Sequence, residues 1–75
     1  MKPSIGRIVH YFPSEPERQE NNLSSPIAGV IVAVWSDNCV NLKLICDAFA
    51  DQWRTSVLKR EAADDLQRWD WPERA

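Results

Sequence analysis

The chain has 75 residues, a formal net charge of -2, two cysteines and one histidine. This length predicts a single domain, residues 1–75, whose small core gives marginal stability without a disulfide, a metal or self-association. The acidic balance argues against direct DNA binding, which depends on a basic surface, but it is compatible with a small anionic ligand held by arginine.

Neither cysteine pairing nor metal binding is expected to supply that stability. Cys39 and Cys46 would point to opposite faces of one strand, so both thiols are predicted to stay reduced. His10 has no Cys-x-x-Cys or His-x-x-x-His companion, so no metal and no cofactor are expected. Self-association remains, and the protein is predicted to be oligomeric.

No apolar run reaches the ~18 residues that a membrane-spanning helix needs. The charged start of the chain, which contains Pro3, does not have the pattern of a signal peptide. The predicted location is the cytoplasm, and no membrane contact is expected.

The chain begins with an alternating pattern over residues 5–12 that predicts a strand, which Pro13 ends. Residues 13–25 are polar and contain two prolines. They predict one long surface loop, either mobile or in contact with a ligand or partner.

The longest apolar stretch, residues 27–46, predicts a central hairpin. Its first strand, residues 27–35, is apolar enough to be buried on both faces, and residues 36–38 form the turn. The second strand, residues 39–46, alternates. Asn41 and Lys43 are expected to face outward, and the inward set is expected to be Val40, Leu42, Leu44 and Cys46. Asn41 is unusual in mid-strand, and it is either solvent-facing or placed to bond a ligand or a loop.

A fourth strand is predicted over residues 52–58. One face would carry Trp53, Thr55 and Val57, and the other Arg54, Ser56 and Leu58. Residues 59–66 predict a loop with one helical turn, because an isolated helix of that length is marginal. Residues 67–71 predict a short last strand.

These elements predict an all-β fold, a small, partly open, five-stranded antiparallel SH3-like barrel. The alternative is a twisted sheet with one helix, residues 59–67, packed on it. Four tryptophans are many for this length. Core filling is the expectation for Trp35 and Trp53, whereas the pair Trp69 and Trp71 near the chain end is more open to a binding role.

The pattern predicts no catalysis. The chain has two glycines, too few for a glycine-rich phosphate loop, and it has no nucleophile elbow. The adjacent carboxylates Asp64 and Asp65 would diverge in direction, as expected of a solvated loop. A non-enzymatic binding protein is therefore the expectation.

Polar and aromatic residues around the hairpin are the candidates for ligand binding. A histidine beside a tyrosine at a strand end can line a rim pocket, an arginine beside hydroxyls can hold a phosphate, and tryptophans on one face can stack on a base. Each group also has a purely structural explanation, as sheet surface or barrel closure. The candidates are His10, Tyr11, Trp35, Asp37, Asn41, Arg54, Thr55, Ser56, Trp69 and Trp71.

The order of several short motifs resembles a group of small bacteriophage and prophage proteins. The motifs are His10-Tyr11, Val34-Trp35-Ser36-Asp37, Val40-Asn41-Leu42, Thr55-Ser56-Val57 and Trp69-Asp70-Trp71-Pro72-Glu73-Arg74. That group tends to have histidine between the last two tryptophans and a glycine-rich connection before them. This chain has Asp70 and a charged segment, residues 59–66, at those places.

The resemblance implies a phage accessory protein that acts in the host cell cytoplasm. Small phage proteins of this size are often non-catalytic binders, and some sequester the nucleotide signals of bacterial immunity. The expected function is capture of a nucleotide-like small molecule by an oligomer. Counter-defence is one role that such capture would serve. The alternative is an interaction module that inhibits or recruits a host or phage protein through a strand edge or the tryptophan face.

Overall fold

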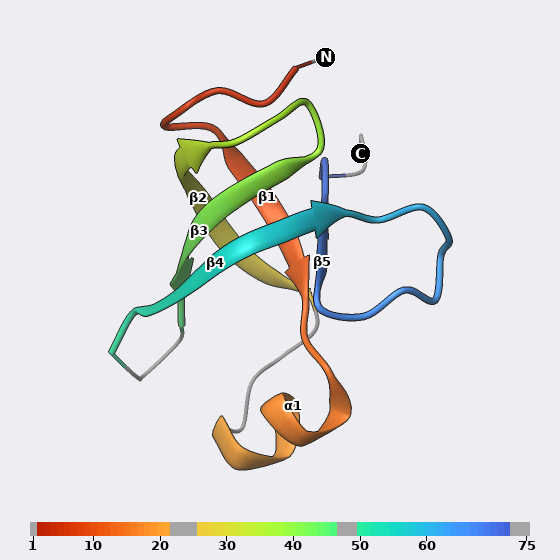
Figure 1. Cartoon of the computed structure of the whole chain (residues 1–75). Coiled ribbons are helices and arrows are strands. Elements are labelled where there is room, and N and C mark those ends of the chain that lie inside the picture. The colour runs from red at the N-terminus through yellow and green to blue at the C-terminus, as the bar shows by residue number, and fades with distance from the viewer. Residues whose placement is uncertain (1, 22–25, 47–49, 73–75) are drawn as a thin grey trace.

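The computed structural model describes residues 2–21, 26–46 and 50–72. Its strands form one closed barrel in which each strand lies beside its neighbours in chain order (Figure 1). The elements are β1 (Ile8–Phe12), α1 (Glu15–Asn21), β2 (Ile27–Val34), β3 (Cys39–Ile45), β4 (Gln52–Lys59) and β5 (Arg68–Asp70). The predicted all-β, five-stranded SH3-like barrel is confirmed, although it is closed rather than partly open. The alternative with a helix over residues 59–67 is wrong.

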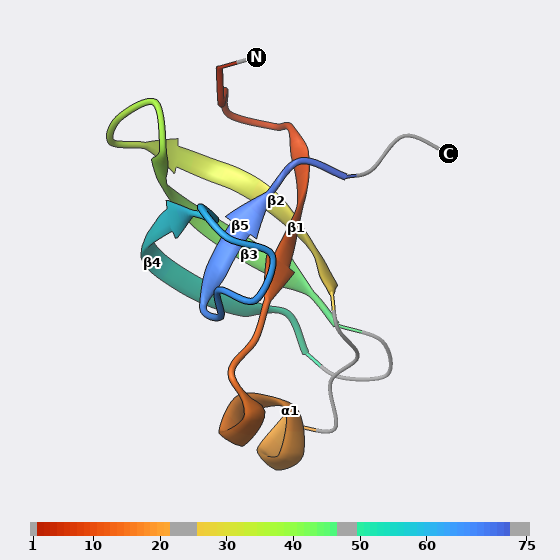
Figure 2. The ribbon, with the colours of Figure 1, turned by 90° about the vertical axis from the view of Figure 1, so that its right-hand side faces the viewer.

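One pairing in the barrel differs from the antiparallel expectation. Strands β4 and β5 run parallel and pair Leu58 with Arg68 and Lys59 with Trp69. Residues 60–67 carry the chain back along the outside of the barrel, so that β5 enters in the same direction as β4 (Figure 2). Strand β5 then closes the barrel on β1, where it pairs antiparallel, with Tyr11 opposite Trp69.

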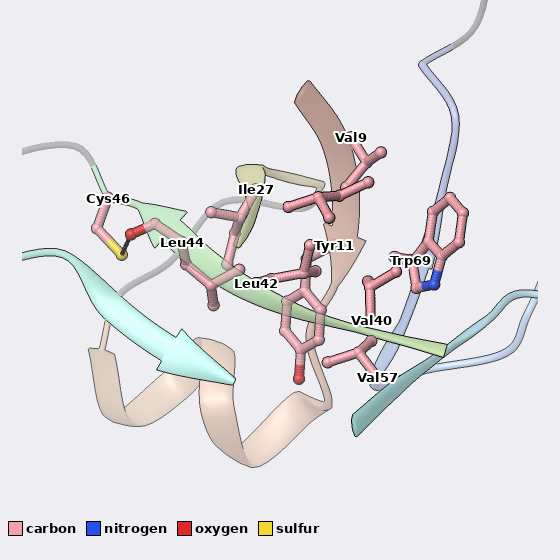
Figure 3. Packing of buried hydrophobic residues seen from close by; sticks show 10 residues of the cluster. Val9, Tyr11, Ile27, Val40, Leu42, Leu44, Cys46, Val57 and Trp69 are labelled. Atoms are coloured by element: carbon pink, nitrogen blue, oxygen red, sulfur yellow. Dashed lines mark hydrogen bonds between the residues drawn. The ribbon is translucent and has the colours of Figure 1, made fainter. Parts of the chain in front are cut away.

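The core comes from one face of each strand. Figure 3 shows these side chains converging between the strands. Its largest member is Trp69, which is fully buried and closes the barrel between β1 and β4. The other buried hydrophobic residues are Val9, Tyr11, Ile27, Ile31, Val40, Leu42, Leu44, Cys46 and Val57.

Strand β2 does not have two buried faces, as its apolar sequence suggested. Ile27 and Ile31 are buried, but Val32 on the other face is 40% exposed. Core filling by Trp35 and Trp53 is also wrong, because they are 65% and 59% exposed. The described residues form no second layer over these side chains, so they are exposed in the single chain.

The predicted loop over residues 13–25 contains helix α1. Ser14 and Glu17 form a capping box: the amide of Ser14 donates to Glu17 Oε1 at 2.9 Å, and the amide of Glu17 donates to Ser14 Oγ at 3.4 Å. The helix lies beyond one end of the barrel, opposite the β2–β3 turn (Figures 1 and 2). Residues 22–25 of the predicted loop lie outside the described residues.

Strand β4 contains a bulge that overturns its predicted faces. Val57 pairs with Val40 and Arg54 pairs with Leu42, so β4 has one more residue than β3 between these pairs. Ser56 has a φ of 53°, in the left-handed region. Val57 therefore points into the core while Trp53 and Thr55 stay exposed, so these three residues do not share one face.

The remaining differences are at element boundaries. The first strand begins at Ile8, because Gly6, with a φ of 93°, turns the chain and donates its amide to the Ile31 carbonyl at 2.8 Å. Residues 59–66 hold no helical turn; beyond the end of β4 they form bends and turns. The last strand covers residues 68–70 rather than 67–71.

Candidate functional site

The residues proposed for ligand binding do not form one site. They lie in four places: near α1, beside the β2–β3 turn, in a pocket between β1 and β5, and in the core. Tyr11 and Arg54 lie in the first place, Trp35, Asn41, Thr55 and Ser56 in the second, His10 and Trp71 in the third, and Trp69 in the fourth, while Asp37 is exposed in the turn itself.

Near α1, Tyr11 and Arg54 meet at a third residue, Glu17. The Tyr11 hydroxyl donates to Glu17 Oε2 at 2.9 Å, and Arg54 Nε donates to the same oxygen at 3.0 Å. Arg54 also donates to Gln52 Oε1 at 2.8 Å. The guanidinium predicted to hold an anionic ligand is therefore paired with a carboxylate of the same chain.

The protonation of this group follows from its burial and its bonds. Burial raises the pKa of Tyr11 to about 12, and the hydrogen bond to Glu17 adds to this effect. Burial alone would raise the pKa of Glu17, but bonds from Ser14, Tyr11 and Arg54 outweigh it and hold that pKa below its ordinary value. A neutral phenol, a carboxylate and a guanidinium thus coexist, and they fix α1 to the barrel.

Beside the β2–β3 turn, Asn41 is an acceptor for three donors. Its Oδ1 accepts from Trp35 Nε1 at 2.8 Å, from the Ser56 amide at 2.8 Å and from Thr55 Oγ1 at 3.1 Å. Asn41 leaves β3 on the side opposite to the core, as predicted from alternation, but it is buried rather than solvent-facing. The indole of Trp35 and the β4 bulge cover it, so this amide oxygen is used within the fold.

The third place is a pocket between β1 and β5, which we call the β1–β5 pocket. It has a volume of about 260 Å³ and is lined by His10, Phe12, Pro26, Arg60, Asp70 and Trp71. A second hollow of about 250 Å³ adjoins it and shares Arg60 and Asp70. The side chain of Arg60 thus borders both.

Arg60, which lines the β1–β5 pocket, has an unusual environment. Its guanidinium lies 3.6 Å from the centroid of the Phe12 ring, and one of its terminal nitrogens donates to the Ala63 carbonyl. Its Nε is buried and has no hydrogen-bond partner. A buried donor without an acceptor is rare, because it costs about 1–3 kcal/mol.

Trp71 and Asp70 complete the pocket. Trp71 packs edge-on against Trp69, with ring centroids 5.3 Å apart and an interplanar angle of 87°, and the Arg7 guanidinium lies 5.7 Å from its ring centroid. Asp70 Oδ1 accepts from the Trp71 amide at 2.8 Å and pairs with Lys59 Nζ at 3.3 Å. The two tryptophans predicted to share a binding face therefore lie in different places. Trp69 belongs to the core and Trp71 lines the pocket.

Four further residues take part in these places without having been predicted from the sequence: Glu17, Phe12, Arg60 and Asp70. For Glu17 a signal existed, because Ser14-x-x-Glu17 is a capping-box pattern that predicts a helix start. Nothing in the sequence pattern indicates the position of Arg60, since it depends on the path of residues 60–67 beside β1.

The described part of the chain holds no cluster of three or more His, Cys, Asp or Glu side chains that could bind a metal, and Cys39 and Cys46 are free thiols. Within the same residues, no helix has the length and hydropathy to span a membrane. Comparisons with known proteins matched no family model, no curated protein and no solved structure.

Proposed function

We propose that the protein is a non-catalytic binding protein that captures a small nucleotide-like ligand in the β1–β5 pocket. The observation that carries the proposal is the buried Nε of Arg60, which has no acceptor and lies in a wall that also holds aromatic rings. A phosphate or carbonyl oxygen of a ligand would supply that acceptor after a small rotation of the side chain.

The other walls suit a planar ring. Trp71 and Phe12 offer aromatic surface, and the Asp70 carboxylate and His10 imidazole lie on cross-strand partners of β5 and β1. A base can stack on an aromatic side chain and donate its amino hydrogens to a carboxylate. The pocket alone is smaller than the ~300–1,000 Å³ of drug-sized ligand sites, but with the hollow beyond Arg60 it approaches the size that a nucleotide needs.

The acidic net charge of the chain is compatible with this function, because Arg60, with Arg7 beside Trp71 and Lys59 beside Asp70, supplies positive charge at the pocket. A phage accessory role, including counter-defence, is the biological setting that the sequence resemblance implies. It is part of the same proposal.

Calorimetric titration with AMP, ADP-ribose and a cyclic dinucleotide tests the proposal. We expect micromolar binding of at least one of them and at least a tenfold weaker Kd for Arg60→Gln. Arg18→Gln is the matched control, because Arg18 is an exposed arginine on α1 whose side chain pairs with Glu15 at 3.1 Å. No binding across the panel, or equal binding by wild type and Arg60→Gln, would overturn the proposal.

A second, independent test compares ligand binding by Trp71→Leu with binding by Trp53→Leu, which is the control. Trp71 lines the pocket, whereas Trp53 is 59% exposed on β4. We expect only the Trp71 change to weaken binding. Far-ultraviolet circular dichroism of each variant separates loss of a ligand contact from loss of the fold.

The alternative, an interaction module for a host or phage protein, has less support at the tryptophan pair, since Trp69 is fully buried. One specific observation favours it: Trp35 and Trp53 expose large aromatic surfaces. A direct binding measurement with purified candidate proteins, in which Trp53→Leu binds as wild type does, would exclude this face as the contact.

A further inference from the structure

The outside of the barrel over β1 to β4 carries several large apolar side chains that are exposed to solvent. Strand register aligns Ile8, Val30, Lys43 and Trp53 in one cross-strand row, because Ile8 pairs with Val30, Val30 with Lys43, and Lys43 with Trp53. Lys43 is the only charged residue of the row. We call the row and its exposed neighbours the outer face, which consists of Ile8, Val30, Val32, Trp35, Lys43, Ile45 and Trp53.

The apolar area of this face is large for so small a protein. Ile8, Val32, Trp35, Ile45 and Trp53 are 48%, 40%, 65%, 46% and 59% exposed. Together they leave roughly 600 Å² of apolar surface in water, at the upper limit of the largest patch on a typical monomer. A standard interface buries about 800 Å² per partner, so the outer face with its polar rim has the area that a stable dimer requires.

We propose that the outer face binds a second copy of this chain in a two-fold symmetric dimer. A C2 interface must be self-complementary, since the same residues face each other in exchanged order. A two-fold axis through the middle of the row, between Val30 and Lys43, meets this condition. It places Ile8 against Trp53 of the other copy and Val30 against Lys43 of the other copy.

This register also accommodates the one charge. The two lysines do not face each other, because each lies over a valine of the other copy. The aliphatic stem of Lys43 can cover Val30 while its ammonium reaches the rim and stays hydrated. Trp53 supplies the large aromatic anchor that interfaces commonly have at their hot spots, and Ile8 supplies the aliphatic surface on which it packs.

A dimer through this face also meets the stability requirement of a short chain. The chain alone buries a limited core, and the described part of it contains neither a metal cluster nor a disulfide. Burial of the outer face would add apolar contacts that the monomer lacks. The inference is independent of the ligand proposal, because the outer face and the β1–β5 pocket share no residue.

Sedimentation velocity and light scattering without ligand test the proposal over a range of micromolar concentrations. We expect twice the monomer mass for wild type, and the monomer mass for Ile8→Lys and for Trp53→Glu. Both residues are exposed, so the fold should survive each change. Leu66→Glu is the matched control, because Leu66 is 50% exposed in the connection before β5, away from the outer face, and this variant should stay dimeric.

The double variant Ile8→Lys/Trp53→Glu tests the register itself. The two positions lie about 14 Å apart in one chain, three strand spacings, so their new charges cannot pair within a copy. Across the proposed axis they face each other, and we expect the double variant to recover at least part of the dimer. Each single variant stays monomeric.

Three results would overturn the proposal. The first is a wild-type monomer at high micromolar concentration, which would leave the face to a different protein. The second is a dimer that both single variants retain, which would place the interface elsewhere. The third is a double variant as monomeric as the single ones, which would exclude the register of Ile8 against Trp53.

Discussion

Glu17 and Asn41 play parallel parts at opposite ends of the barrel. Each is an acceptor that gathers donors from separate elements: Glu17 from β1, β4 and the chain before α1, and Asn41 from β4 and the β2–β3 turn. They differ in charge. Glu17 is an ionised group paired with a guanidinium, whereas Asn41 is a neutral amide oxygen with neutral donors.

The difference has consequences for stability. The bonds of Glu17 depend on pH and include an ion pair whose side chains are partly accessible, 27% for Arg54 and 13% for Glu17. Asn41 is itself buried, although its three bonds are part-buried, and these bonds join neutral groups that do not titrate in the ordinary pH range. We therefore expect the bonds of Asn41 to contribute more to the free energy of unfolding than those of Glu17. We expect the bonds of Glu17 to make that free energy depend on pH.

The largest effect is expected for Asn41→Leu. Trp35 Nε1, Thr55 Oγ1 and the Ser56 amide would lose their common acceptor, and we expect a loss of about 3 kcal/mol in urea unfolding. Asn41→Asp is the control, because a carboxylate oxygen accepts the same bonds, and it should lose less than half as much. An Asn41→Leu variant as stable as wild type would show that the bonds of Asn41 do not contribute more to stability than those of Glu17.

Glu17→Gln should have an intermediate effect of about 1.5 kcal/mol. The amide keeps the shape of the side chain but removes the charge that faces Arg54 and brings an NH₂ group among donors. Glu15→Gln is matched to it on the same helix; its ion pair with Arg18 is exposed, and we expect a change within about 0.5 kcal/mol. Equal effects of the two changes would show that the link from α1 to the barrel is dispensable.

The free energy of unfolding should depend on pH through the bonds of Glu17 and not through those of Asn41. The pKa of Glu17 lies below 4.5 in the folded chain, so its stabilisation is fully present above that pH and is lost as pH falls through the lowered value. The stability difference between wild type and Glu17→Gln should therefore shrink in acid. The difference for Asn41→Leu should stay constant across the same range.

The alkaline side gives the converse test on the same cluster. The pKa of Tyr11 is raised from 10.0 to about 12, so its stabilisation is complete below pH 10 and is lost as pH rises through about 12. Tyr11→Phe should lack this alkaline decrease in unfolding free energy, although it costs stability at neutral pH because the hydroxyl bonds are gone. An identical alkaline decrease in the variant would assign it to other groups.

The smallest effect is expected at Ser56, whose φ of 53° shapes the bulge beside Asn41. Glycine adopts that conformation without steric cost, so Ser56→Gly should change stability by no more than about 0.5 kcal/mol. Ser56→Val should cost about 1 kcal/mol, because a β-branched residue is strained there. Thermal unfolding of the two variants checks this, and a large loss for glycine would assign the contribution to the hydroxyl instead.

Much of the fold could be predicted from the sequence. The strand over residues 27–34 and the alternation of Val40, Leu42 and Leu44 have the strand period, and prolines and polar turns separate the segments. These signals are local, since they depend on side chains a few positions apart. They predicted the five strands and an SH3-like barrel, but they predicted a partly open barrel, and its closure by β5 is visible only in the structure.

The candidate site was less predictable, because hydrogen-bond partners are distant in sequence. The sequence suggested an anion site at Arg54, but the fold places Glu17 beside it. For Asn41 the sequence left open a solvent-facing side chain or one that bonds a ligand or a loop, and the structure shows it bonded to Trp35 and to the β4 bulge. The pocket residue Arg60 had no sequence signal of its own. Its role depends on how the connection to β5 brings its guanidinium over the ring of Phe12 at the end of β1.

The sequence by itself determined the barrel, through the strand period and the turn residues. Only the tertiary structure decided which polar groups are used internally and which remain for a ligand, as the contrast of Asn41 with Arg60 shows. The tertiary structure also decided which tryptophans are buried: Trp69 is buried and Trp53 is exposed. The reason is that a one-residue bulge and the closure by β5 reassign faces, and neither follows from local pattern.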